Sequence, residues 1–180
     1  MVTYNHTMPG RTLILLALGC FGLAWAADPA FEPLWKYQGT WDVKRSAAGA
    51  APVSDKLQND CAEIGRFFLC QQTVNGKVGA LIVFTPAETT GHYYTQAIMP
   101  DGKAGGRGEL EIQGDRWTYP SKEEDGGKTK YYRTVNVFSG KDRIHFEQSE
   151  SADGKTWTVN ASGDEVRTAS AGTRPDPRRN

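Results

Sequence analysis

The sequence predicts an all-β fold: a single antiparallel up-and-down β-barrel of about eight to ten strands, preceded by a short helix. Three observations carry this prediction. Turn-forming pairs such as Asn75-Gly76 and Asp153-Gly154 recur at short, even intervals. The segments between them are rich in β-branched and aromatic residues. Several of these segments, such as 108–113 and 143–147, alternate apolar with polar side chains, as a half-buried strand does.

The first 26 residues have the features of a cleaved signal peptide. Arg11 precedes an apolar run that is shorter than the roughly 20 residues needed to cross a bilayer. Ala24-Trp25-Ala26 then provides the small-x-small pattern before a cleavage site. We expect an exported, periplasmic or secreted protein without a membrane span in its mature form; an uncleaved anchor is the alternative. Lipidation of Cys20 is disfavoured because Leu does not occupy the third position before it.

Residues 27–168 are expected to form the barrel domain, and residues 169–180 a disordered basic tail. The tail contains two prolines and three arginines but almost no apolar residue. The whole chain has 21 Lys and Arg residues against 21 Asp and Glu residues. This balance gives no indication of a nucleic-acid partner.

The expected elements follow from the turn signals in chain order. Residues 29–37 form the helix-like segment, with Phe31, Leu34 and Trp35 as an apolar plug. Open meanders leave two unpaired edges, which closure into a barrel removes. The expected strands are 40–47, 52–64, 67–74, 78–85, 91–99, 105–113, 116–122, 129–138, 143–150 and 155–167.

Cys61 and Cys70 are predicted to form a disulfide. If Gly65-Arg66 is a two-residue hairpin loop, counting outward from it places these two cysteines opposite each other. They fall on a non-hydrogen-bonded pair, where the Cα atoms approach to about 4.5 Å. That separation is within reach of a disulfide. The oxidising compartments that exported proteins enter favour its formation. The chain has no Cys-x-x-Cys motif that would suggest a redox role.

The start of the barrel carries a motif, Gly39-Thr40-Trp41, directly after the short helix. A Gly-x-Trp at this position resembles the entry to the lipocalin-like barrels of the calycin superfamily, in particular bacterial secreted domains of unknown function. In that family the tryptophan closes one end of the barrel, often under an arginine that follows the last strand. The resemblance implies this closing role for Gly39, Trp41 and Arg167.

Two functions found in related barrels do not carry over. The Arg-x-Tyr pair of fatty-acid-binding proteins is absent near the C-terminus, as is the last-strand histidine of haem-binding nitrobindin-like barrels. His92 and His145 are not accompanied by clustered carboxylates or thiolates, so no metal site is predicted. No cofactor is expected.

The candidate ligand-binding residues are those expected to face the barrel interior. Trp41 and Arg45 share one face of the first strand. Tyr131 and Arg133 share a face of the eighth, and Tyr93 lies in the fifth. Guanidinium groups inside an apolar barrel would suit an acidic head group. The alternative is that an arginine pairs with Glu150 or lies at the solvated rim. Tyr94, Trp117 and Tyr119 are further candidate lining residues.

The sequence favours an exported, monomeric barrel that binds a small apolar or acidic amphipathic ligand. The alternative is a packed barrel that acts as a cell-envelope interaction protein. A connected interior cavity of roughly 300 Å³ or more would distinguish the two. No Gly-x-Ser-x-Gly nucleophile motif is present, and the acid pair Asp164-Glu165 is expected to be solvated. Catalysis is therefore not predicted; an isomerase or cyclase would require a perturbed histidine or carboxylate inside the cavity.

Overall fold

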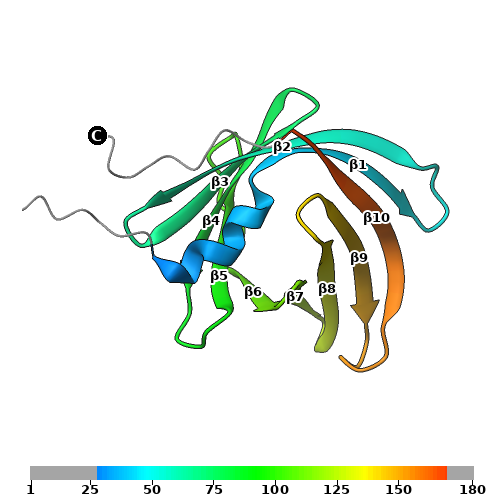
Figure 1. The fold of residues 1–180 in the computed structure, drawn as a ribbon. Coiled ribbons are helices and arrows are strands. Elements are labelled where there is room, and N and C mark those ends of the chain that lie inside the picture. The colour runs from blue at the N-terminus through cyan, green and yellow to red at the C-terminus, as the bar shows by residue number, and fades with distance from the viewer. Residues whose placement is uncertain (1–27, 170–180) are drawn as a thin grey trace, which may run out of the picture.

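The computed structural model describes residues 28–169, which form one short helix and a closed ring of ten antiparallel strands (Figure 1). The predicted all-β barrel fold is therefore confirmed. The expected signal peptide, Cys20 and the basic tail lie outside the described residues. The elements are the 3-10 helix η1 (Pro29–Tyr37) and the strands β1 (Gly39–Ala47), β2 (Val53–Ile64), β3 (Phe67–Val74), β4 (Lys77–Pro86), β5 (His92–Ile98), β6 (Gly108–Gln113), β7 (Arg116–Asp125), β8 (Lys128–Ser139), β9 (Arg143–Ser151) and β10 (Thr158–Ala169).

Each strand pairs with its neighbours in the sequence, and the pairing of β1 with β10 closes the ring. Across this seam Trp41 lies opposite Arg167, and Val43 lies opposite Glu165. Because side chains alternate between the two faces of a strand, these four residues share the inner face of the barrel. The seam thus brings the first and last strands of the domain together at the interior.

The hairpin turns follow the residues that allow them. Asn75 and Gly76 both have positive φ angles, of 50° and 76°, which a type I′ turn requires at its two central positions. Gly65 has a φ of 59° and begins the turn between β2 and β3. This turn sets the register in which Cys61 pairs with Cys70, with their Cα atoms 4.1 Å apart and a disulfide between them.

The helix η1 covers one end of the barrel, which we call the closed end. Asp28 caps the helix by accepting a hydrogen bond from the Ala30 N–H, and a proline suits the first helical position because its missing N–H would be unpaired there. Phe31 and Leu34 on the inner face of the helix are fully buried. The turns 114–115 and 140–142 lie at the same end.

Aromatic rings fill the closed end. Trp35 contacts Phe68 edge-on, with the ring centroids 5.0 Å apart. Tyr37 and Phe138 both pack against Trp117, each with a centroid separation of 4.7 Å. Such edge and tilted pairs stabilise beyond the area that they bury. The closed end is therefore the packed part of the core, and it holds the helix in place.

Two strands, β6 and β10, each start three residues later than the sequence predicts. The sequence predicts a strand over 105–113, but β6 begins at Gly108, and only an isolated bridge between Ala104 and Ile98 precedes it. Gly105 and Gly106 have no side chain to pack and lose much conformational entropy in a strand. The segment 99–107 therefore forms a connecting loop between β5 and β6. The start of β10 is likewise later, at Thr158.

Candidate functional site

A cavity of about 700 Å³ lies inside the barrel between the helix and the far end of the strands. Its lining begins at Tyr37, the last residue of η1, and reaches Ala50 and Ala51 in the turn between β1 and β2. We call the end with this β1–β2 turn the open end. The volume lies within the range of small-molecule sites and above the 300 Å³ that the sequence analysis set as its criterion.

Apolar side chains form much of the cavity wall, and polar side chains lie both at its floor and toward its open end. Leu57, Ile82 and Phe84 line one side, and Val43 and Phe146 line the side next to the seam. Gly163 leaves room for the Phe146 ring on the side next to the seam. A Cβ at position 163 would lie 2.7 Å from that ring. The polar side chains that line the cavity are Tyr37, Arg45, Asp55, Asn59, Gln72, Thr95, Tyr119, Thr134, Asn136, Gln148 and Glu165.

Two tyrosines meet at the floor of the cavity. The Tyr37 hydroxyl at the end of η1 lies 2.8 Å from the Tyr119 hydroxyl of β7. Asn136 of β8 donates its side-chain N–H to the Tyr37 oxygen at 2.6 Å. Burial raises the pKa of both phenols above their ordinary value, so both keep their protons at neutral pH.

This hydrogen-bond arrangement leaves one proton unused. One of the two hydroxyls donates to the other, so the pair uses one of its two O–H hydrogens internally. The Tyr37 oxygen already accepts from Asn136. Within residues 28–169, the second O–H has no acceptor. The tyrosine pair can therefore donate one hydrogen bond to a molecule in the cavity.

Glu165 of β10 faces the same cavity. Its Oε2 atom is shielded from solvent and has no hydrogen-bond partner among the described residues. Burial raises the pKa of this carboxyl from an ordinary value near 4.5 to about 7. The charge of Glu165 in turn contributes to the raised pKa of Tyr37 and of Tyr119, which indicates that the three groups share one electrostatic environment.

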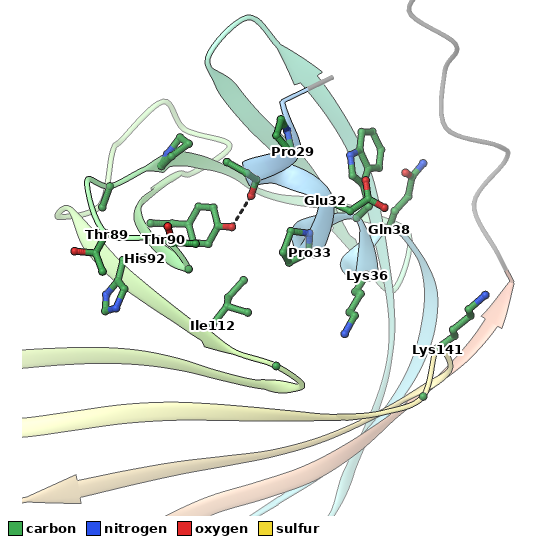
Figure 2. Close-up of a pocket in the computed structure, with 18 of the residues that line it drawn as sticks. Pro29, Glu32, Pro33, Lys36, Gln38, Thr89, Thr90, His92, Ile112 and Lys141 are labelled. Carbon is green, nitrogen blue, oxygen red and sulfur yellow. Dashed lines mark hydrogen bonds between the residues drawn. The ribbon is translucent and has the colours of Figure 1, made fainter. Parts of the chain in front are cut away.

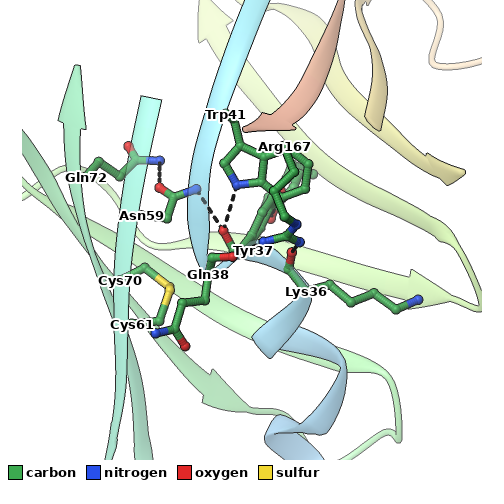
Figure 3. The surroundings of a disulfide bond; sticks show 10 residues. Lys36, Tyr37, Gln38, Trp41, Asn59, Cys61, Cys70, Gln72 and Arg167 are labelled. Atoms are coloured by element: carbon green, nitrogen blue, oxygen red, sulfur yellow. Dashed lines mark hydrogen bonds between the residues drawn. A yellow bond between two sulfur atoms is a disulfide. The ribbon is translucent and has the colours of Figure 1, made fainter. Parts of the chain in front are cut away.

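The side chains of the Gly-x-Trp motif lie at the closed end, below the cavity (Figure 3). Trp41 is fully buried and donates its indole N–H to the Tyr37 carbonyl at 3.0 Å. The Arg167 guanidinium lies over the Trp41 ring at 4.0 Å and donates to the carbonyls of Lys36 and Gln38. Trp41 does not line the cavity, in contrast to the sequence-based expectation; it holds the end of the helix against the first and last strands.

Figure 3 also shows a chain of side chains that connects the cavity wall to this closed end. Gln72 donates to Asn59 at 3.3 Å, and Asn59 donates to the Tyr37 carbonyl at 3.2 Å. The Cys61–Cys70 disulfide joins the same two strands, β2 and β3. The Tyr37 backbone is thus fixed by two donors, Asn59 and Trp41, and its hydroxyl by contacts with β7 and β8.

Tyr93 belongs to the closed end as well. It is buried and donates its hydroxyl to the Ala30 carbonyl of η1. It borders a groove of about 1080 Å³ on the other side of the helix, where Figure 2 shows Pro33, Ile112 and His92. This groove lies among the helix, the β4–β5 connection and the turns of the closed end, and is separate in its lining from the interior cavity. Tyr93 therefore anchors the helix and does not line the interior cavity.

The arginines expected to anchor an acidic head group lie elsewhere. Thr134 and Asn136 of β8 line the cavity, so alternation places Arg133 and Tyr131 on the outer face of the barrel. There the Arg133 guanidinium lies 4.0 Å from the Trp157 ring. The interior placement expected for these two residues is corrected accordingly.

Arg45 does line the cavity, but at its rim. It forms an ion pair with Asp55 at 3.0 Å, and its side chain is about half exposed. The solvated rim is one of the alternative positions expected for such an arginine, but its partner is Asp55, whereas Glu150 pairs with Lys130. Tyr94 lies outside the cavity too, with the Arg107 guanidinium over its ring at 3.4 Å.

Sequence analysis missed Glu165 and Tyr37 as site residues. Asp164-Glu165 was expected to be a solvated acid pair, whereas only Asp164 is exposed. The signal was present in the alternation of β10, because Arg167 and Glu165 share a face. Once Arg167 is placed inside over Trp41, Glu165 must point inward as well.

Within the described part of the chain, no group of three or more His, Cys, Asp or Glu side chains is placed to hold a metal ion. His145 lies on the outer face, exposed, with its Nδ1 2.9 Å from an Asp164 carboxylate oxygen. Across residues 28–169, the structure has no helix long and apolar enough to cross a membrane.

Comparison with known proteins adds two structures of low sequence identity. No protein-family model and no curated protein matches the sequence. The chain is similar to Rv2717c from M. tuberculosis, with 14% identity over 80% of this chain and 100% of that one, and a TM-score of 0.45. It is also similar to the S-type phycobiliprotein lyase CPES from Guillardia theta, with 12% identity over 78% of this chain and 93% of that one, and a TM-score of 0.45.

Proposed function

We propose that the protein is an exported binding barrel that holds a small amphipathic molecule in its interior cavity. The apolar part of the molecule would lie against Leu57, Ile82 and Phe84, and its polar end would face Tyr119 and Glu165 at the floor. The observation that carries the proposal is the cavity itself, about 700 Å³ in volume with apolar walls and a polar floor.

The charges in the cavity favour a neutral polar end over a carboxylate. Arg45 is the one basic side chain among the lining residues that the structure describes, and it is already paired with Asp55. The pKa of Glu165 is about 7, so at higher pH its carboxyl is ionised and would repel a second carboxylate. A carbonyl, a hydroxyl or an amide could instead accept the spare O–H of the tyrosine pair.

Export is part of this proposal and has independent support. Structural disulfides persist in oxidising compartments such as the periplasm and the extracellular space. The Cys61–Cys70 disulfide joins neighbouring strands. The signal-peptide features of residues 1–26 point in the same direction.

A dye-displacement assay tests the binding. Nile red, a neutral dye, should gain fluorescence when it enters the cavity, and a series of twelve-carbon competitors should displace it. At pH 8 we expect dodecanol and dodecan-2-one to compete at concentrations about tenfold lower than dodecanoic acid, a difference of about 1.4 kcal/mol. Stronger competition by the acid would contradict the proposed neutral head group.

Two neighbouring residues of β10 provide matched variants. Ala161 lines the cavity, whereas Ser162 does not and lies on the opposite face. Ala161→Trp should abolish dye binding by filling the cavity, and Ser162→Trp should leave it unchanged. Dye binding that survives Ala161→Trp would place the dye outside the cavity. It would then support an interaction protein whose cavity holds no ligand.

A further inference from the structure

We propose that the cavity floor is also an acid–base site, in which Glu165 moves a proton between two carbons of an enolisable carbonyl compound while the Tyr37–Tyr119 pair holds the carbonyl oxygen. The substrate class is a β,γ-unsaturated ketone with an apolar tail, and the product is its conjugated isomer. This inference rests on the proposed function, because the ketone must occupy the same cavity.

The tyrosine pair supplies the group that an enolate oxygen needs. It has one O–H hydrogen without an acceptor among the described residues, and both phenols lie at the cavity floor. Asn136 supports the pair by donating to the Tyr37 oxygen. A donor fixed before the substrate arrives stabilises the negative charge that develops on the oxygen without further reorganisation.

Glu165 supplies the base. Its Oε2 atom is shielded from solvent, has no hydrogen-bond partner in the described structure, and belongs to a side chain that lines the cavity. The shielded Oε2 keeps the carboxyl poorly solvated, and its other oxygen is the one that would meet a C–H group of a molecule in the cavity. The raised pKa of Glu165, about 7, also suits a group that must both accept and return a proton near neutral pH.

No other titratable group in the described structure competes for this role. The strand neighbours of Glu165 on the inner face are Val43 of β1 and Ile144 of β9. Toward the closed end, Arg167 is engaged with backbone carbonyls and with Asp142. Toward the open end, the Arg45–Asp55 pair remains at the rim.

The other charged groups of these elements lie away from Glu165. On β1, Asp42 and Lys44 occupy the outer face, as do His145 and Glu147 on β9. From η1 and β7, the groups that face the floor are the two phenols. Among residues 28–169, Glu165 is therefore the one carboxyl at the floor.

The proposed step balances without an added reagent. The Glu165 carboxylate removes the proton from the carbon between the carbonyl and the C=C bond. The electron pair of that C–H bond forms a new C=C bond, and the carbonyl π pair moves to the oxygen, where the tyrosine pair donates to it. Glu165 then returns the proton to the far end of the dienolate, which restores its carboxylate and gives the conjugated ketone.

The test uses 4-hexylcyclohex-3-en-1-one, whose hexyl chain matches the apolar walls and whose product absorbs in the ultraviolet. The full folded protein should accelerate formation of the conjugated isomer, and Glu165→Gln should lower that rate by a factor of about 100 or more. Glu147→Gln is the matched control, because Glu147 lies exposed on the outer face of neighbouring β9. A substrate deuterated at C2 should pass deuterium to C4 of the product, because Glu165 returns the proton that it removed.

Ketone binding is measured separately by changes in its NMR line widths. If the ketone binds, but isomerises no faster with the protein than with Glu165→Gln, the acid–base site is overturned and the binding barrel stands. If no ketone binds and no Nile red is retained, both proposals are overturned. The unaltered protein gives a second criterion: its rate should rise with pH through about 7, and a flat profile from pH 5 to 9 would overturn the assignment of Glu165.

Discussion

The two ends of the barrel interior are built from different side chains, although the same ten strands run through both. At the closed end, Trp41, Phe68 and Trp117 are fully buried and pack against the helix. Toward the open end, Gln72, Thr134 and Gln148 line a cavity. Apolar packing at one end stabilises the fold, and the other end can keep polar groups that a packed core would not accommodate.

The largest expected difference between the ends concerns the loss of a large side chain. Trp41→Ala should lower the free energy of unfolding by about 3–5 kcal/mol, because it leaves a void in a packed region and removes the hydrogen bond to the Tyr37 carbonyl. Ile82→Ala, which only enlarges an existing cavity, should cost about 1–2 kcal/mol. Urea unfolding measures both, and equal losses would remove the distinction between the ends.

The disulfide between β2 and β3 should contribute next. Replacing both Cys61 and Cys70 by Ala should lower the free energy of unfolding by about 3 kcal/mol, because the cross-link restricts a loop of about ten residues in the unfolded chain. Dithiothreitol should reproduce this loss in the unaltered protein. It should have no effect on the double variant, and a similar loss there would mean that the reductant acts elsewhere.

Glu165 should destabilise the fold as the pH rises. Its folded pKa of about 7 lies above its ordinary value, so the folded state retains a proton that the unfolded chain releases. Stability is therefore lost between about pH 4.5 and pH 7. Glu165→Gln removes this dependence and should stabilise the protein by about 3 kcal/mol at pH 8, with no gain at pH 4. Urea unfolding at these two pH values measures the difference.

If Glu165→Gln instead lowered the free energy of unfolding at pH 8, the Glu165 carboxylate would be stabilised by a partner in the folded protein. It would also remove the reason for treating the cavity floor as a place where an ionised group is costly. Ser162→Gln, on the outer face of the same strand, provides the control and should change stability equally at both pH values.

The rim should show the smallest effects. Asn75 and Arg45 both hold the pKa of Asp55 below its ordinary value, and the hydrogen bond from Asn75 is the larger cause. Asn75→Gly should therefore raise the Asp55 pKa more than Arg45→Ala does. Arg45→Ala should change stability by less than about 1 kcal/mol, since exposed ion pairs contribute little. NMR titration of the Asp55 carboxyl measures the order of the two effects.

Much of the architecture could be predicted because turns act locally. Gly65-Arg66 and Asn75-Gly76 set the hairpins, and the first of these also sets the pairing of Cys61 with Cys70. The loop at 105–107 was harder to predict, because two glycines followed by Arg107 do not distinguish an irregular strand from a connection.

The site was harder to predict because a cavity reverses the usual pattern of a strand. Both faces of β8 carry mixed side chains, with Tyr131 and Val135 outside and Thr134 and Asn136 inside. Apolar-inside reasoning therefore oriented Arg133 incorrectly. Only the register across the whole sheet settles which face is which, and hydrophobicity within one strand does not contain that information.

The seam between β1 and β10 has a kinetic consequence. Nine of the ten strand pairings join neighbours in sequence across short connections, whereas the seam must bring the two ends of the domain together. Closing so long a loop costs roughly 3 kcal/mol more than closing a hairpin. We therefore expect the hairpins to form first and the seam last. Since Val43 and Glu165 face each other across that seam, the interior cavity is completed only in the final step of folding.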